Sequence, residues 1–241
     1  MNKNIKQNHF DKFFQNFRNK KWKMVNQSIV SLQDKKVIAS ELLLRVELED
    51  NFFDNEDIFP DITYDKRFSE VTLGILQVLK NKIKLNNELE GIYFINVVPT
   101  DFQLKEFIEE ISVLCKEFKE KGSLLGIELS ETFSGKQLRS VKIHLDRLKK
   151  DGLVIALDDF GKGNLNVKDL EPIPINFIKV DKSLCTSEDL SKSRPLKEVV
   201  EYCKKNNISL VAEGIESEEQ MRRVIEIGFN YAQGYFFDLP N

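Results

Sequence analysis

The stretch from Leu153 to Gly163, LVIALDDFGKG, decides the fold. Its first half, up to Leu157, is a continuous apolar run, which is typical of a strand buried on both faces of a parallel sheet. Two adjacent carboxylates, Asp158 and Asp159, follow at the expected end of that strand, and two glycines then permit a sharp turn. Adjacent buried carboxylates repel each other and lose hydration, so they require a cation, a shared proton or strong hydrogen bonds. The alternative is a turn in which one Asp caps the next helix.

Outward from this stretch, predicted strands and helices alternate along the chain. The predicted strands cover residues 26–32, 37–46, 91–98, 124–129, 153–157, 175–180, 208–212 and 231–237. The predicted helices cover residues 67–85, 101–121, 137–150, 167–170, 195–206 and 218–227. The first two strands are joined by a polar connection of hairpin length, and residues 47–65 predict an acidic, irregular excursion. Right-handed strand–helix units in this number close into a barrel more readily than into an open sheet, so we expect one α/β barrel domain over residues 22–241.

Residues 1–21 predict a separate amphipathic helix before the barrel. Phe10, Phe13, Phe14 and Phe17 follow one another at helical spacing in an otherwise polar, Lys- and Asn-rich segment. We expect this apolar stripe to cover one end of the core. A dimer contact is the first alternative, and binding to a membrane surface is the second.

Amino-acid composition argues against several classes of protein. Of the 241 residues, 41% are hydrophobic and 31% are charged, which is typical of a soluble globular protein. The formal net charge of −3 argues against a dedicated nucleic-acid binder, which usually carries a basic stripe. The chain has no apolar run approaching the ~20 residues that span a bilayer and no apolar signal-peptide core at its start. We therefore expect a cytoplasmic protein that binds no DNA and does not span the membrane.

The cysteines and histidines restrict the metal chemistry. Cys115, Cys185 and Cys203 show no paired spacing and predict reduced thiols. His9 and His144 are too few and too far apart in sequence for a histidine-based metal site. Any metal must then be held by oxygen ligands, which favours Mg²⁺, Mn²⁺ or Ca²⁺.

Polar side chains occur at or near the carboxyl end of nearly every predicted strand. They are Glu41, Asn96, Glu128, Asp158, Asp159, Lys179, Asp181, Glu213 and Gln233. In a parallel barrel these ends converge on one face, where catalytic residues are placed. Five or six carboxylates in one barrel mouth repel strongly unless divalent cations neutralise them. Two metals ~3.5–4 Å apart, bridged by a shared Asp, form the usual clamp for hydrolysis of phosphoryl esters.

Two of these positions keep simpler alternatives. Lys179 is placed to activate a water or to neutralise a phosphate oxygen, and its alternative is a plain Lys–Asp ion pair inside the barrel. Glu41 lies within an apolar strand, and its alternative is an internal pair with Arg45, four residues on and on the same strand face. Taken together, the acids favour a metal-dependent phosphoesterase.

Several motifs in order resemble the EAL domain family of cyclic di-GMP phosphodiesterases over roughly residues 22–240. SELLLR stands where the family has its glutamate-alanine-leucine signature, here Glu41-Leu42-Leu43, and NQSIVSL is similar to the opening strand. INVVPTDF, IELSET (Glu128 and Glu131), ALDDFGKG, PINFIKVD, VAEGIESEEQ and YAQGYFF follow in the family's order and spacing. Five or more motifs in register are far more specific than one short pattern.

The resemblance implies a modified (β/α)₈ TIM-like barrel with one antiparallel strand that hydrolyses cyclic di-GMP to linear 5′-pGpG with two Mg²⁺ or Mn²⁺ ions. Ca²⁺ would be an inhibitory or non-productive ion, and a homodimer is expected. The implied metal ligands are Glu41, Asn96, Glu128, Asp158, Asp159 and Glu213, with Asp158 bridging the two ions. Catalytic roles are implied for Lys179, Glu213, Gln233 and Glu216. The first two orient or deprotonate the attacking water, and Glu216 anchors the loop after Asp159. Gln27, Arg45 and Asp181 are implied to contact the ligand.

The chain departs from the family pattern in three places, one of which is Glu47 to Asp65 in place of the Pro-rich segment that usually follows the first motif. Leu42 replaces the signature alanine, and Lys162 to Asn166 replaces a loop that usually reads Thr-Gly-Tyr-Ser-Ser and helps to place the second metal. An active phosphodiesterase is the first hypothesis, because the metal- and water-handling residues are retained. A catalytically silent cyclic di-GMP receptor and an interaction module that has lost the nucleotide are the alternatives.

Overall fold

The computed structural model describes residues 3–48, 51–52, 65, 67–85, 89–130, 133–163, 165–185 and 193–240. The strands are β1 (Trp22–Ser31), β2 (Val37–Leu48), β3 (Asn51–Phe52), β4 (Ile92–Val97), β5 (Leu124–Leu129), β6 (Val154–Phe160), β7 (Phe177–Val180), β8 (Ser209–Ala212) and β9 (Tyr231–Ala232). The helices are α1 (Lys3–Arg18), α3 (Phe68–Leu85), α4 (Lys105–Glu120), α5 (Gly135–Lys150), α6 (Val167–Leu170), α7 (Lys182–Cys185), α8 (Arg194–Asn206) and α9 (Glu218–Ile227), with a 3₁₀ turn, η2 (Asp101–Gln103).

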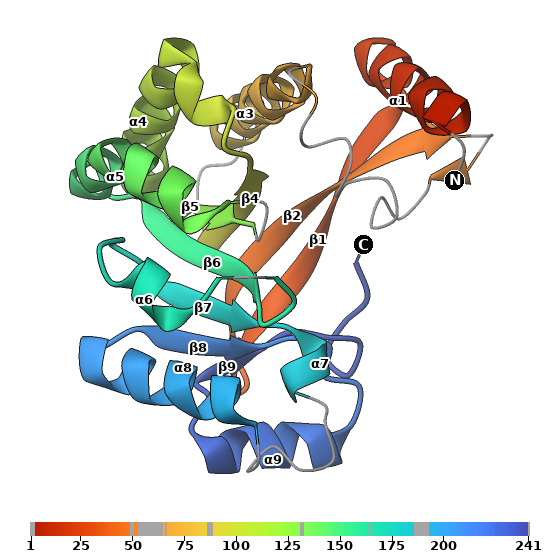
Figure 1. The fold of residues 1–241 in the computed structure, drawn as a ribbon. Helices are drawn as coiled ribbons and strands as arrows, with labels where there is room; N and C mark the ends of the chain where they lie inside the picture. Colours follow the sequence, from red (N-terminus) through yellow and green to blue (C-terminus); the bar gives the residue numbers. More distant parts are fainter. Residues whose placement is uncertain are drawn as a thin grey trace.

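Eight of the strands close into a barrel in the order β1-β2-β4-β5-β6-β7-β8-β9, with β9 pairing back onto β1. β1 runs antiparallel to both of its neighbours, whereas the pairs from β2–β4 round to β8–β9 are parallel. The helices from α3 to α9 lie around the strands (Figure 1). The predicted α/β barrel with one antiparallel strand is confirmed.

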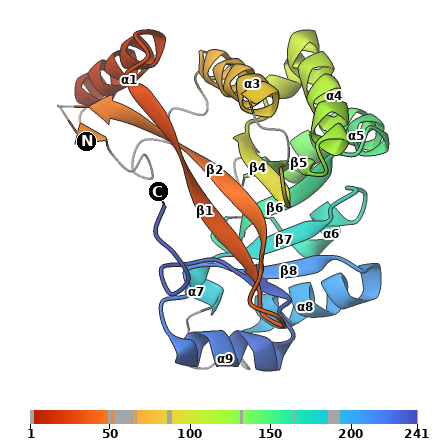
Figure 2. The same ribbon diagram turned by 180° about the vertical axis from the view of Figure 1, so that it is seen from behind.

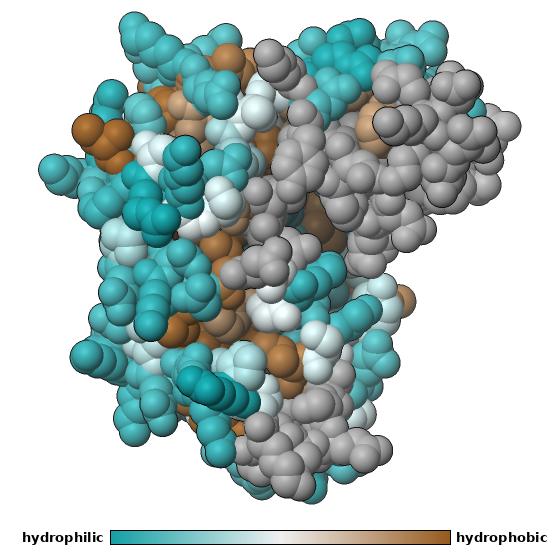
Figure 3. Space-filling model, viewed as in Figure 1, coloured by the Kyte–Doolittle hydropathy of each residue, from teal (hydrophilic) through white to brown (hydrophobic). Residues whose placement is uncertain are grey.

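The inside of the barrel is filled in layers. Side chains alternate between the two faces of a strand, so every second residue points inward. One buried cluster collects apolar residues from β1, β2, β4, β6 and β8: Ile29, Ala39, Phe94, Val154, Ala156 and Val211. The larger cluster packs the other faces of the strands against the helices. Hydrophilic side chains dominate the outward helix faces seen in Figure 3, with hydrophobic ones in the seams between them.

Local sequence signals set several helix boundaries. α5 and α9 each begin with a capping box, in which Ser134 pairs with Gln137 and Ser217 with Gln220. α9 ends at Gly228, whose left-handed backbone (φ 106°) suits a residue without a Cβ. None of the described helices has the length and apolarity needed to cross a bilayer.

Helix α1 packs against the open end of the β1–β2 hairpin and lies beside α3 (Figure 2), where Arg18 pairs with Glu70. Phe13, Phe14 and Phe17 are buried in the main core cluster, and the ring of Phe17 stacks on Trp22 at 4.9 Å between centroids. The prediction that the phenylalanine stripe packs onto the core is confirmed. The boundary between residues 1–21 and the barrel stays a prediction.

The structure differs from the sequence prediction at several elements, and it includes two that were not predicted, the short strand β3 and helix α7. The helix predicted from residue 101 begins with η2 instead, because Leu104 is extended (φ −95°, ψ 117°) and separates this turn from α4. β6 does not end before the two acids but continues through Phe160, and the last strand stops at Ala232 rather than at residue 237. Most of the excursion at 47–65, together with Glu131 and Asn164, lies outside the described residues.

Gly126 on β5 makes room for Phe94 in the inner apolar layer. A Cβ added at Gly126 would lie 2.3 Å from Cδ1 of Phe94, which faces it across the β4–β5 pair. We predict that Gly126→Ala lowers the free energy of unfolding by about 1–3 kcal/mol, the usual cost of overpacking, as measured by urea denaturation. The same substitution in a Phe94→Leu background should cost less, because the ring is gone. An equal cost in both backgrounds would contradict the packing argument.

Candidate active site

The polar residues at the barrel mouth form the layer above the inner apolar cluster. Each lies two residues beyond a residue of the layer below, and the period of a strand therefore turns it inward. Glu41 follows Ala39, Asp158 follows Ala156, and the same step relates further pairs along the barrel. These are Phe94 and Asn96, Gly126 and Glu128, Phe177 and Lys179, Val211 and Glu213, and Tyr231 and Gln233. The barrel thus has an apolar floor and a polar mouth.

A bulge in β6 explains how two consecutive acids line the same cavity. Between Leu157 and Phe160 the register with β7 shifts, so β6 carries one residue more than its partner. Asp159 takes a left-handed backbone (φ 57°), which Asp adopts more readily than most residues. In a regular strand Asp158 and Asp159 would point to opposite faces. With the bulge, both contribute to the wall of the mouth.

One ammonium group lies among four carboxylates in this mouth. The Nζ of Lys179 is 2.9 Å from Glu41 Oε2, 3.1 Å from Glu128 Oε1, 2.8 Å from Asp158 Oδ1 and 3.0 Å from Glu213 Oε1. Lys179 and Glu128 are 1% and 0% exposed. The predicted alternative, a simple Lys–Asp pair, therefore does not account for the contacts of Lys179, which involve four carboxylates. Four formal negative charges surround one positive charge with little water to screen them.

Two amides hold the carboxylate of Glu41 in place. Gln233 Nε2 donates to Glu41 Oε2 (2.7 Å) and to Gln27 Oε1 (2.9 Å), and Asn96 Nδ2 donates to Glu41 Oε1 (3.2 Å). Gln27 lies opposite Glu41 in the β1–β2 register. Together with Lys179, these amides form the environment of Glu41.

The pKa values of the buried acids are shifted in different directions. Burial raises the pKa of Asp158 to about 6 despite Lys179, and burial together with neighbouring carboxylates raises the pKa of Glu128 and Glu213 well above the usual range. For Glu41, burial is outweighed by Lys179 and the amide hydrogen bonds, and the pKa falls to about 2. Burial acts to lower the pKa of Lys179, but the four carboxylates outweigh it and raise this pKa well above its ordinary value.

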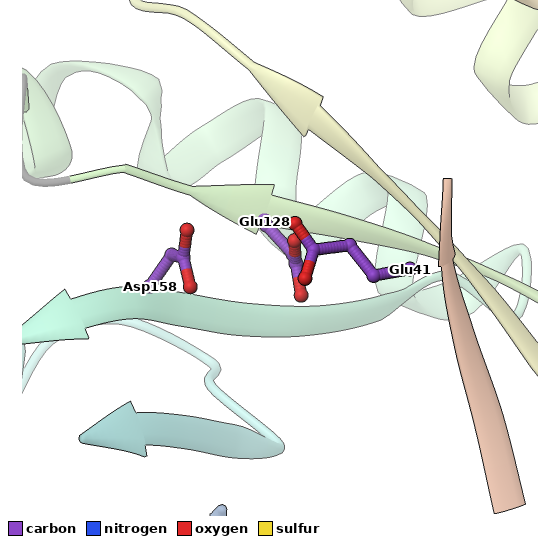
Figure 4. Close-up of side chains that lie close together, drawn as sticks. All are labelled: Glu41, Glu128 and Asp158. Atoms are coloured by element: carbon purple, nitrogen blue, oxygen red, sulfur yellow. The ribbon is translucent and has the colours of Figure 1, made fainter. Parts of the chain in front are cut away.

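The donor set fits a divalent cation bound by oxygen. Glu41, Glu128 and Asp158 each offer a carboxylate oxygen, and these atoms lie within 4.8 Å of one another (Figure 4). Glu128 Oε1 and Asp158 Oδ1 are paired with the ammonium of Lys179, whereas Oε2 of Glu128 is buried with no hydrogen-bond donor among the described residues. Such oxygens are the ligands that Mg²⁺, Mn²⁺ and Ca²⁺ prefer. The cluster can therefore hold a metal.

The remaining predicted site residues lie around a cavity of about 370 Å³ above the cluster. Its wall includes Gln27, Arg45, Asp159, Asp181 and Glu216, and Asp181 is almost fully buried. The carboxylate of Asp181 accepts the backbone N–H of Ser183 at 2.8 Å. Glu216 lies at the exposed rim, where its own N–H donates to Gln220 Oε1, and its anchoring of the loop after Asp159 stays a prediction.

Sequence reasoning missed several residues that also line this cavity, among them the polar residues Ser130, Lys182 and Tyr235. Lys182 follows Asp181 directly, and Tyr235 stands two residues after Gln233 in the stretch YAQGYFF. Tyr235 therefore lies within a motif quoted above for another residue, as does Ser130 in IELSET, whereas Lys182 is the first residue after PINFIKVD. Ser130 follows β5, Lys182 begins α7 and Tyr235 lies in a turn after β9, so a strand period gives no direction for these side chains.

Comparison with known proteins places the chain in a family. The model of the EAL domain matches residues 11–240. The cyclic di-GMP phosphodiesterase RocR of Pseudomonas aeruginosa PAO1 is 35% identical over 150 residues, covering 60% of this chain and 38% of RocR. The cyclic di-GMP phosphodiesterase PdeL of Escherichia coli K12 is 32% identical over 177 residues, covering 73% of this chain and 48% of PdeL. The chain thus spans less than half the length of each of these relatives.

The fold is also shared with solved structures. The c-di-GMP complex of the PaMucR phosphodiesterase superposes with a TM-score of 0.78 at 20% identity, covering 91% of this chain and 96% of that one. At that identity the likeness shows the fold alone. Because the family model extends over residues 11–240, the chain belongs to the EAL domain family.

Proposed function

We propose that this domain is a divalent-metal-dependent phosphodiesterase that hydrolyses cyclic di-GMP to linear 5′-pGpG. The observation that carries the proposal is the buried cluster of Glu41, Glu128 and Asp158, whose carboxylate oxygens converge within 4.8 Å below the cavity in the barrel mouth. Relatives named cyclic di-GMP phosphodiesterases support the choice of substrate. Mg²⁺ and Mn²⁺ are the proposed ions.

The chain's own residues supply the framework for the metal and the substrate. Glu41, Glu128 and Asp158 would hold the first cation, with Asn96 and Glu213 beside them, and Asp159 would face a second one. When bound, such a cation polarises a phosphate oxygen and makes water more acidic. Gln27 and Arg45 on the cavity wall are placed to contact the nucleotide, and the planar fork of an arginine suits phosphate oxygens.

Hydrolysis adds water across one P–O3′ bond, so one proton leaves the attacking water and one reaches the departing 3′ oxygen. Glu213 is the proposed proton acceptor, because burial raises its pKa well above that of an ordinary carboxyl group and so makes its carboxylate a stronger base. Lys179 remains an ammonium in this arrangement, since its pKa is raised as well. It therefore acts as a cation and hydrogen-bond donor that orients water or phosphate, not as a base.

We predict that Glu41→Ala abolishes hydrolysis. The substitution removes a carboxylate from the cluster and leaves Lys179, Gln233 and Asn96 without their shared acceptor. Even the outer partners of metal ligands are worth about 10–100-fold in activity or affinity, so the loss should exceed about a hundredfold. Chromatography of cyclic di-GMP and pGpG after incubation with Mg²⁺ or Mn²⁺ measures it.

Glu47→Ala is the matched control. Glu47 lies on the same strand but pairs with Lys21 outside the cavity, so this variant should keep wild-type turnover. Full activity in Glu41→Ala would contradict the metal assignment. Saturable binding of cyclic di-GMP by the wild type without pGpG in any metal would replace the enzyme with a receptor, and no binding at all would leave a protein-interaction module.

We further predict that metal binding releases protons near pH 6. Without a cation, the raised pKa values of Asp158, Glu128 and Glu213 keep protons on the cluster, and a cation must displace them. The apparent affinity should therefore be weaker at pH 6 than at pH 8, by about tenfold per unit for each proton released. Titration calorimetry with Mn²⁺ in two buffers of different ionisation enthalpy counts the protons.

Asp158→Asn removes a group with a pKa of about 6 and should release fewer protons than the wild type, in addition to binding more weakly. An affinity that does not change between pH 6 and pH 8, with no proton release, would show that the acids are already charged before the metal binds.

A further inference from the structure

A second lysine pairs with the second acid of the DDFGKG stretch. The Nζ of Lys162 lies 3.4 Å from Asp159 Oδ2. The backbone brings the two residues together, because the N–H of Lys162 donates to the carbonyl of Asp159 at 3.1 Å and closes a turn. Both residues belong to the wall of the cavity. The pair is therefore part of the mouth and not a chance contact on the outer surface.

The turn that holds this pair is constrained at two backbone positions. Asp159 has φ 57° and Gly161 has φ 108°, both in the left-handed region. A Cβ at Gly161 would also lie 2.2 Å from Cδ1 of Leu184, so only glycine fits there without a shift. With the turn fixed, the start of the Lys162 side chain is fixed beside the Asp159 carboxylate.

Lys162 and Lys179 differ in how they can respond to a metal ion. Lys179 is 1% exposed and is held by four carboxylates, whereas the side chain of Lys162 is 55% exposed and has solvent on one side. Lys162 can leave Asp159 for water at little cost, since exposed ion pairs are worth little. Until it does, its charge opposes any cation that approaches Asp159.

We propose that the ammonium of Lys162 is the counter-ion of Asp159 in place of a second divalent cation. This inference rests on the proposed function and adds to it. The domain holds one cation tightly, at Glu41, Glu128 and Asp158, and admits a second only when Lys162 leaves Asp159. Lys162 is then a residue that sets the metal stoichiometry, and through it the metal concentration at which the site is complete.

Electrostatics give the expected size of the effect. A divalent cation and an ammonium a few ångströms apart repel each other even at the dielectric constant of water, and the flexible lysine relieves part of that repulsion. We therefore expect removal of the Lys162 charge to tighten the second site by roughly tenfold and to leave the first site unchanged.

The test is an equilibrium titration of the purified chain with Mn²⁺, in which electron paramagnetic resonance counts the free ion. The wild type should show one tight and one weaker site. Lys162→Thr should tighten the weaker site by about tenfold, whereas Lys162→Arg should keep the wild-type pattern because it keeps the charge. Lys168→Thr is the matched control: Lys168 is exposed on the nearby helix α6 and does not line the cavity, so it should change nothing.

The outcomes separate this inference from the proposed function. Two equally tight sites in the wild type, or the same weak site in Lys162→Thr, would overturn the role of Lys162 and leave the metal-dependent function intact. Equal tightening in Lys168→Thr would show an effect of net charge and would also overturn it. No Mn²⁺ bound by any variant would overturn both the inference and the metal-dependent function.

Discussion

The arrangement of the barrel mouth depends on one electrostatic constraint: four carboxylates share a single buried ammonium, that of Lys179. Burial and mutual repulsion raise the pKa of three of these acids, so the group is short of positive charge in a place that water barely reaches. A buried charge cluster of this kind does not stabilise a fold. A bound cation would supply the missing positive charge and so explain why the cluster lies in the centre of the barrel. This need for a cation connects the fold to phosphodiester chemistry.

The barrel satisfies the constraint through a simple repeat. An apolar residue fills the interior, and the next inward residue along the same strand carries a polar group into the mouth, as with Ala156 and Asp158 or Phe177 and Lys179. The apolar layer excludes water from below, and neighbouring strands in register set the spacing of the polar groups, as between Asn96 and Glu128. The cluster is therefore as rigid as the sheet that carries it, which is what preorganised binding of a metal requires.

Much of the fold and of the candidate site could be predicted from the sequence, because the patterns that indicate them are local. Alternating strands and helices, acids at strand ends and a set of motifs in order led to the barrel and to its mouth. The missing parts depend on contacts between distant segments. The bulge that turns Asp159 toward Asp158 shows only in the register with β7, and the contact of Gln233 with Glu41 joins residues 192 positions apart. From the sequence, a single ion pair was the simpler interpretation of Lys179. Its four partners lie on four other strands or strand ends, so the sequence around Lys179 does not reveal them.

Lys179 competes with the first cation for the same carboxylates, and this competition can be tested directly. Crystals of the chain grown with Mn²⁺ should give an anomalous difference peak within ligand distance of Glu41, Glu128 and Asp158. The Nζ of Lys179 should then have moved away from at least one of the oxygens it now contacts at 2.8–3.1 Å. Density without a peak there, at saturating Mn²⁺ and with Lys179 still among all four carboxylates, would show that the ammonium alone completes the cluster and would contradict the account.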